Sequence, residues 1–379
     1  MSLLRYELRK LFMLPMLWVF LALCLALNGL MIFGNASGRG FFNETSGAAR
    51  VLGQRVDARF LDGLAALPRT ENTDALWETA NGMKDVFQSY DVSELSAYYE
   101  YQVRHSPRMV RWIHGKYEKI ALRVHTLAES GAGMDLYAGP MTHDRHQFLF
   151  GTLLRAVTTE SALLGALASL YLLGCEDITR TACLLCASRA GRRQWRCKAA
   201  AGILASLVLW MALAGLSLEL YFIVWDYGGI WDANVSGSFN YIDELVLVKP
   251  FLTWADLTVA GYLAASLGMS ASLALVCCLM ACVAGLLIRS AYLAALAPVV
   301  LGGAGLLAAV RLGEHGPLPA FAAACFQPVV LWLDEAEWFT DSGIKTVVPW
   351  QEPITAALWL LLAGAALLAA YKRFCGKDI

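Results

Sequence analysis

Six apolar runs divide the chain, and each is long enough to cross a membrane as a helix. A span needs about 20 apolar residues, because a helix rises about 1.5 Å per residue through about 30 Å of hydrocarbon. The runs predict transmembrane helices at residues 14–33, 154–174, 199–225, 257–288, 291–312 and 354–371. The predicted fold class is an all-α polytopic membrane protein with six transmembrane helices and a mainly helical extracellular domain.

Composition agrees with this pattern. Of 379 residues, 58% are hydrophobic and 16% are charged, whereas soluble domains average about 45–50% apolar and about 25% charged residues. The first run exceeds the apolar stretch of a secretory signal and no small-residue cleavage site follows it, so we expect an uncleaved span rather than a signal peptide.

Basic residues predict the orientation, since short loops rich in Lys and Arg stay in the cytoplasm. One set of short segments carries 13 of them: Arg5, Arg9, Lys10, Arg180, Arg189, Arg192, Arg193, Arg196, Lys198, Arg289, Lys372, Arg373 and Lys377. The alternate short segments carry only Lys249, Arg311 and Lys345. We therefore expect both termini, including the tail 372–379, to be cytoplasmic in a multi-pass protein.

The segment 34–153 is then an extracellular insertion. It has a helix start signal at Asn72–Asp74 and a second helical stretch over residues 92–129, interrupted only by Pro107. Outer loops follow at 226–256 and 313–353. Within the latter, residues 320–333 are apolar but too short to cross, which favours a re-entrant or interfacial helix; a soluble core helix packed on the insertion is the alternative.

Cysteine usage predicts no disulfide scaffold. The chain has ten cysteines, but the insertion has none, and Cys325 is the only one expected outside. A single external thiol cannot form an intramolecular bridge, and thiols on the cytoplasmic side stay reduced.

Residues 1–13 form an amphipathic pattern ahead of the first span. An apolar face alternates with the basic residues Arg5, Arg9 and Lys10, which suits a helix lying on the inner interface. A plain cytoplasmic extension of the first span is the alternative. Pro15 disfavours helix at Leu14, so the chain is expected to bend there.

The segment 175–198, between the second and third spans, predicts a short amphipathic cytoplasmic helix. The carboxylates of Glu176 and Asp177 open it and basic residues close it, the charge order that a helix dipole favours. Ile178, Thr181, Leu184 and Leu185 share one face. A simple re-entry turn held to anionic lipid by its arginines is the alternative.

This segment resembles the coupling helix of ABC-2 type transporter permeases. That pattern has a Glu, a Gly-Thr pair, two Leu, a small polar residue, a Pro, an Arg and a Lys at the next span. It is matched by Glu176, Thr181, Leu184, Leu185, Ser188, Arg192 and Lys198, with Asp177 beside the first. Arg180 stands at the glycine and Arg189 at the proline. The opening residues Tyr6, Glu7, Arg9 and Lys10 resemble the elbow helix of the same family.

The resemblance implies a transport subunit without enzymatic activity of its own, most simply an exporter of a drug, peptide, lipid or ion in a bacterial plasma membrane. The chain lacks a Gly-x-x-x-x-Gly-Lys-Ser/Thr phosphate loop. No cofactor is therefore expected here, and ATP and Mg²⁺ would bind a partner. The expected partners are an ABC ATPase subunit, a second permease protomer (identical or different) and the lipid bilayer, with no nucleic acid.

Two other classes of function remain open: a membrane sensor or scaffold with a ligand-binding extracellular domain, and a secondary transporter. Charged residues in the spans bear on this choice. Arg155 and Glu160 in the second span, and Glu219 in the third, mark either a structural ion pair or a substrate pathway. His143 and His146 fit a solvated surface better than a metal site. Glycines at 302, 303 and 305 allow close helix packing, either within the chain or against a second protomer.

Overall fold

The chain forms a helical membrane bundle with a helical insertion. The computed structural model describes residues 3–136, 141–181, 184, 187, 191–237, 251–288 and 290–376. Over these residues it contains helices and isolated bridges but no strand. Six helices are long and apolar enough to span a membrane. They contain α2 (Pro15–Gly34), α9 (Leu154–Ile178), α11 (Gln194–Val224), α12 (Val259–Leu287), α13 (Ala291–His315) and α16 (Gln351–Gly376). The predicted fold class is confirmed.

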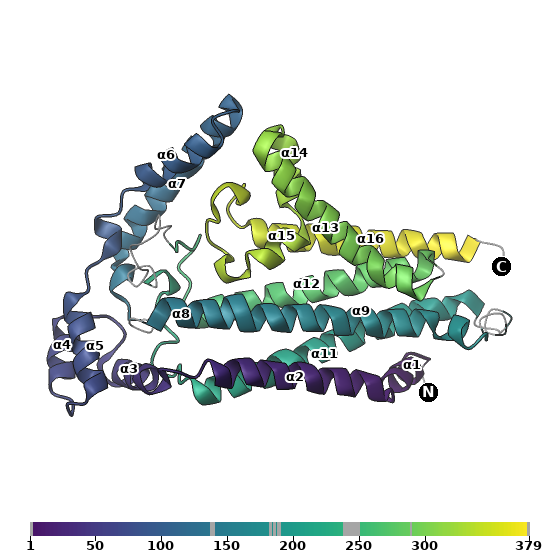
Figure 1. The fold of residues 1–379 in the computed structure, drawn as a ribbon, viewed down its shortest axis with the longest axis horizontal. Coiled ribbons are helices and arrows are strands. Elements are labelled where there is room, and N and C mark those ends of the chain that lie inside the picture. Colours follow the sequence, from purple (N-terminus) through teal and green to yellow (C-terminus); the bar gives the residue numbers. More distant parts are fainter. Residues whose placement is uncertain are drawn as a thin grey trace.

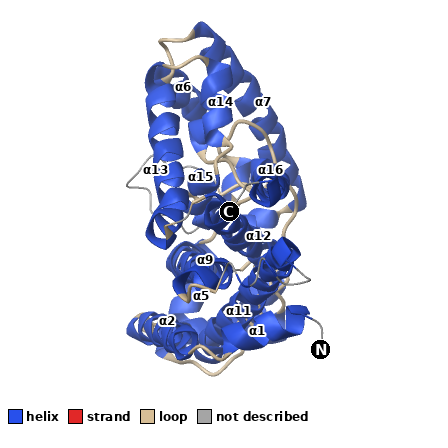
Figure 2. Cartoon of the chain, turned by 90° about the vertical axis from the view of Figure 1, so that its right-hand side faces the viewer, coloured by secondary structure: helices blue, strands red, loops and turns tan. Residues whose placement is uncertain are grey.

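Most of these helices run side by side, as Figure 1 shows, with both termini at one end of the bundle and the insertion at the other. Helix α9 packs against both α11 and α12, and α12 packs against α16. The view along the bundle in Figure 2 shows α1 (Leu3–Phe12) beside α11, away from α16. Helix α9 therefore forms the centre of the bundle.

Small residues allow α9 and α11 to approach closely. A Cβ atom at Gly202 would lie 2.6 Å from Ser169 Oγ, and one at Gly165 would collide with Ser206. Membrane helices gain little from the hydrophobic effect when they associate, so close backbone contact of this kind supplies much of the attraction. Larger residues at either glycine would separate the two helices.

The bend before the first span is confirmed. Helix α1 ends at Phe12, Leu14 is extended with ψ of 116°, and Pro15 opens α2. Pro is well tolerated there, because the first turn of a helix has no partner for its N–H groups.

The second span begins earlier than the hydrophobic run indicates. Helix α8 (Thr142–His146), the π-helical η4 (Gln147–Leu153) and α9 join into one continuous rod. Phe148, Phe150 and Leu153 are buried in the core shared with the insertion. The polar residues before them lower the average hydropathy, so the sequence indicates only the most apolar part of this helix.

The insertion is helical, as predicted. Its elements are α3 (Arg39–Leu52), α4 (Ala58–Ala65), α5 (Glu71–Gly82), η1 (Val86–Gln88), α6 (Val92–Gln102), α7 (Pro107–Ser130) and η2 (Ala132–Met134). The predicted helix over 92–129 is broken ahead of Pro107, which begins α7. Helices α3 to α5 share a core with the end of α11, whereas α6 and α7 share one with the loop before α16.

The loop between α13 and α16 folds back onto the bundle. The single helix expected at 320–333 is two helices, α14 (Leu318–Cys325) and α15 (Pro328–Leu333), because Pro328 starts a new one. The short turns η7 (Glu335–Glu337) and η8 (Gly343–Lys345) follow. Glu335 and Trp338 are fully buried, so this loop is an integral part of the fold.

Helix α13 leans away from the other spans (Figure 1). Within the chain, only 11% of an apolar 18-residue stretch of α13 is buried, against 56% of such a stretch of α12. No atom lies within 4 Å of a Cβ built at Gly302 or Gly303, so these glycines make no close helix contact inside this chain. Gly305 packs against the side chain of Gln327.

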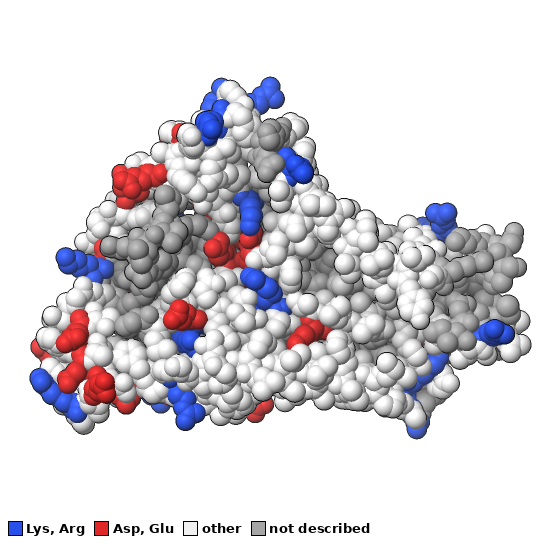
Figure 3. Space-filling view, viewed as in Figure 1, with Lys and Arg blue, Asp and Glu red and all other residues white. Residues whose placement is uncertain are grey.

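Charge is distributed along the molecule as a membrane protein requires. On the face drawn in Figure 3, acidic and basic residues gather over the insertion and the loop before α16, and a few basic residues mark the far end. The surface between them is mostly uncharged. Such a band suits hydrocarbon, because unpaired charges there are costly.

Candidate functional site

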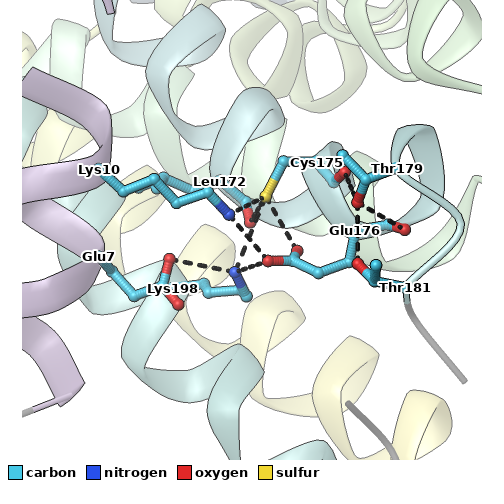
Figure 4. Close-up of polar contacts among 8 residues, drawn as sticks. All are labelled: Glu7, Lys10, Leu172, Cys175, Glu176, Thr179, Thr181 and Lys198. Atoms are coloured by element: carbon cyan, nitrogen blue, oxygen red, sulfur yellow. Dashed lines mark hydrogen bonds and ion pairs between the residues drawn. The ribbon is translucent and has the colours of Figure 1, made fainter. Parts of the chain in front are cut away.

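A buried ionic cluster lies at the end of the bundle that carries both termini (Figure 4). Lys198, in the first turns of α11, is fully buried, and its Nζ lies 2.6 Å from Glu176 Oε1 and 3.1 Å from Glu7 Oε2. Lys10 Nζ lies 3.0 Å from the same Glu176 oxygen. Three elements, α1, α9 and α11, are therefore joined by two carboxylates and two ammonium groups.

Charge balance explains why this cluster is tolerated away from water. An isolated buried ion is very costly, but a compact group with equal numbers of opposite charges recovers much of that cost through short hydrogen bonds. Cys175 adds to the network, since its Sγ accepts from Lys10 at 2.8 Å and donates to Glu176 at 3.0 Å.

The charge of Lys10 is stabilised by this setting. Burial acts to lower the pKa of Lys10, but the hydrogen bonds to Cys175 and Glu176 outweigh it and raise the pKa above the ordinary value of 10.5. A raised pKa contributes stability at every pH below the ordinary value, and that contribution is lost only as the pH rises above it. Lys10 is thus positively charged throughout the neutral range.

The end of α9 turns sharply after the cluster. The Thr181 N–H donates to the Glu176 carbonyl at 2.9 Å, and the Thr179 N–H donates to the Cys175 carbonyl at 3.0 Å. Between them Arg180 has φ of 58°, the left-handed conformation in which helices end and which glycine adopts most easily. Arg180 stands where the coupling-helix pattern has its glycine, so the backbone makes the turn that glycine would permit.

The predicted coupling residues separate into two groups. Glu176 and Lys198 are buried and form ion pairs with residues of α1. Thr181 is exposed and Leu184 is 74% exposed. Leu185 and Ser188 lie outside the described residues, as do the side chains of Asp177 and Arg192. Glu176 and Lys198 are therefore placed to fix the ends of the segment rather than to touch another protein.

The elbow residues divide in the same way. Glu7 is buried and Lys10 half-buried in the cluster, while Tyr6 is 58% exposed and Arg9 is exposed. Leu11 is fully buried in the core that α1 shares with α2, α9 and α11. The sequence identified all four polar residues but gave no indication that two of them face α9 and α11.

Within the bundle, the suggested pair between Arg155 and Glu160 is absent. Glu160 accepts instead from Asn28 Nδ2 at 2.9 Å, and the same amide donates to Ser217 at 3.0 Å. The Arg155 guanidinium donates to the Leu333 carbonyl at 2.9 Å. The two side chains project from different sides of α9, because five residues along a helix correspond to about one and two-fifths turns. Glu219 is exposed.

Two polar groups of this region were missed in the sequence. Asn28 is 1% exposed and links α2, α9 and α11. Glu335 is fully buried, and its Oε1 accepts from Thr158 at 2.8 Å. The available signal for Glu335 was its position between the apolar residues 330–333 and the aromatic pair Trp338 and Phe339. No group of three His, Cys, Asp or Glu in the described part of the chain is placed to hold a metal ion, and the described cysteines form no disulfide.

No family model, no curated protein and no solved structure matches the chain. Its function is therefore inferred from its own residues.

Proposed function

We propose that this chain is the transmembrane permease subunit of an ABC-2 type transporter, exporting a substrate with energy from a separate ATPase subunit. The observation that carries the proposal is the cluster of Lys198 with Glu7 and Glu176. It joins α1, as the elbow helix, to the end of α9 and the start of α11, at residues that match the family pattern. The left-handed turn at Arg180 supports the same reading.

The cluster suits a mechanical role. A force applied to the segment between α9 and α11 would reach both helices and α1 together, because short ionic contacts hold their ends as one body. Helix α9 packs on α11 and α12 along much of its length, so its displacement would carry the bundle with it. Rigid-body movement of packed helices is a common way to alternate access across a membrane.

The proposal also specifies the orientation of the chain and its partners. The end with both termini faces the cytoplasm of a bacterial cell, where the exposed Leu184 and Thr181 contact the ATPase. A second permease protomer completes the transport path, and ATP and Mg²⁺ bind to the ATPase chains alone. The poorly covered helix α13 is available for contact with lipid or with that protomer.

The test is a search of the neighbouring genes for a phosphate-loop ATPase, followed by co-expression of the two chains. The tagged chain should retain this ATPase through purification in detergent, and ATP hydrolysis should rise in its presence. Leu184→Asp should abolish both effects, because it places a charge at an exposed position of the segment between α9 and α11. Leu122→Asp is the matched control, since Leu122 is 71% exposed on α7 in the insertion. Retention of the ATPase by the Leu184 variant would contradict the proposal.

A second candidate, a sensor with an external ligand, is favoured by one observation in the insertion. A cavity of about 810 Å³ lies between α6 and α7, with Tyr117 among its lining residues. The Tyr117 hydroxyl donates to Asp341 at 2.7 Å, and Lys116 Nζ lies 2.7 Å from the same carboxylate. A ligand in this cavity would thus contact Tyr117, whose hydroxyl binds Asp341 in the loop before α16.

A further inference from the structure

An apolar slot lies between α9, α12, α13 and α16, beneath α15. Two cavities of about 440 and about 360 Å³ form it. They share the lining residues Met280, Pro298, Leu301 and Trp359, so they adjoin one another along α12. From Leu273 to Ile288 the slot follows α12 over about 22 Å at the rise of an α-helix. Its length and its apolar lining fit an alkyl chain.

One side of the slot is loosely closed. Pro298 lies inside α13, where it removes a backbone hydrogen bond and favours a kink. Gly302 and Gly303 line the slot, and no atom lies within 4 Å of a Cβ built at either position. Because α13 is mostly uncovered within the chain, a chain-like molecule can enter from the bilayer past these glycines.

Polar groups gather at one end of the slot only, under α15. They are the hydroxyls of Thr158 and Thr159 and the amide of Gln327. Trp332 Nε1 donates to the Thr159 hydroxyl at 2.9 Å, which fixes α15 to α9. None of the described residues that line the slot carries a charge. The slot is thus apolar over most of its length, and its few polar residues lie at the end under α15.

A buried carboxyl group stands directly behind this polar end. Glu335 Oε1 accepts from the Thr158 hydroxyl at 2.8 Å, while Glu335 Oε2 is buried without a hydrogen-bond partner. The nearest cationic group, Arg155, donates to the Leu333 carbonyl instead, and no ion pair joins it to Glu335 among the described contacts. An ionised carboxylate is costly in such surroundings unless a positive charge approaches it. Ionisable groups inside membrane proteins commonly mark substrate pathways.

We propose that the slot binds a cationic amphiphile, with its alkyl chain between α12, α13 and α16 and its ammonium head at Thr158, where Glu335 provides the opposite charge. This inference names the substrate class of the permease and so rests on the proposed function.

The test uses fluorescence quenching by spin-labelled amphiphiles with the same octadecyl chain and different heads. The full chain is placed in nanodiscs of neutral phosphatidylcholine and titrated with the trimethylammonium, alcohol and carboxylate forms. Trp359 lines both cavities, so the difference between the wild-type chain and Trp359→Phe isolates quenching inside the slot. The ammonium form should quench this component saturably and bind about tenfold more tightly than the alcohol, as expected for one opposite charge at short range in a partly shielded site.

Matched variants assign the effect. Gly302→Phe fills the slot and should abolish saturable quenching, whereas Leu307→Phe, on a position of α13 that is 66% exposed and does not line the slot, should leave it unchanged. If Gly302→Phe fails to insert, Gly303→Leu provides a smaller block. Glu335→Gln should remove the preference for the ammonium head. Glu160→Gln should retain it, because Glu160 faces Asn28 on α2.

Equal binding of the three heads, or quenching that survives both slot-filling variants, would show that the slot holds bilayer lipid only and would overturn the proposal. A preference that persists in Glu335→Gln would overturn the role of that carboxylate. Purification with the ATPase is scored separately. If the probe binds but the ATPase does not co-purify, the transporter proposal is refuted and the binding site stands. If the ATPase co-purifies but the probe does not bind, the binding site alone is refuted.

Discussion

Replacing Lys198 by Met tests whether the ionic cluster holds α1, α9 and α11 together. Lys198 Nζ is 2.6 Å from Glu176 and 3.1 Å from Glu7. With an effective dielectric constant of about 20, these distances correspond to gross attractions of about 6 and about 5 kcal/mol. Desolvation offsets much of this, and removing one partner of a buried ion pair typically costs about 3–5 kcal/mol. We expect Lys198→Met to lower the free energy of unfolding by about that amount.

Charge counting gives this prediction a sharper form. Lys198→Met leaves two carboxylates and only Lys10, so the buried cluster carries one unbalanced negative charge. Adding Glu7→Gln restores neutrality through the remaining pair of Lys10 and Glu176, which is 3.0 Å apart. We therefore expect the double variant to be more stable than Lys198→Met by about 1–3 kcal/mol, within the range of coupling energies between contacting residues.

The measurement is SDS titration of the chain in neutral detergent micelles, followed by circular dichroism. Lys345→Met is the matched control, because Lys345 is 2.7 Å from Asp334 but its side chain is 53% exposed. An exposed pair is worth at most about 1 kcal/mol. The reasoning fails if Lys198→Met costs no more than this control, or if adding Glu7→Gln destabilises the chain further.

Three other substitutions test separate parts of the fold. Arg180→Gly should raise the free energy of unfolding by about 0.5–1 kcal/mol in the same titration, because it relieves the left-handed backbone at φ of 58°; a loss of stability would contradict the turn. Asn28→Ala should cost about 1–3 kcal/mol, since it leaves the buried side of Glu160 without its donor at 2.9 Å, and an unchanged titration midpoint would exclude this contact. Lys116→Met breaks the buried pair with Asp341 at 2.7 Å and should speed proteolysis of the loop before α16 while leaving the membrane-protected fragments intact; an unchanged digestion rate would show that the insertion does not hold that loop.

The sequence by itself determined the number and approximate position of the spans. Hydrophobic length is a one-dimensional property, so the apolar runs located α2, α11, α12 and α16 within a few residues. Pro15 determined the bend after α1 and Pro107 the start of α7, because proline acts on its own backbone and on the preceding residue. Pro328 divides α14 from α15 by the same local effect, although the apolar run 320–333 predicted a single helix there.

The tertiary structure alone decided which polar groups meet. Glu7 and Lys198 are 191 positions apart, and the burial of Glu335 against Thr158 joins residues 177 positions apart. Hydropathy and helical periodicity carry no information about such pairs, because they depend on how the helices are arranged around α9. The same arrangement decided that α13 stands apart, since its apolar sequence resembles that of α12 while its packing does not. The sequence thus specified what crosses the membrane, and the packing of α9 with its neighbours specified which charges lie at the candidate site.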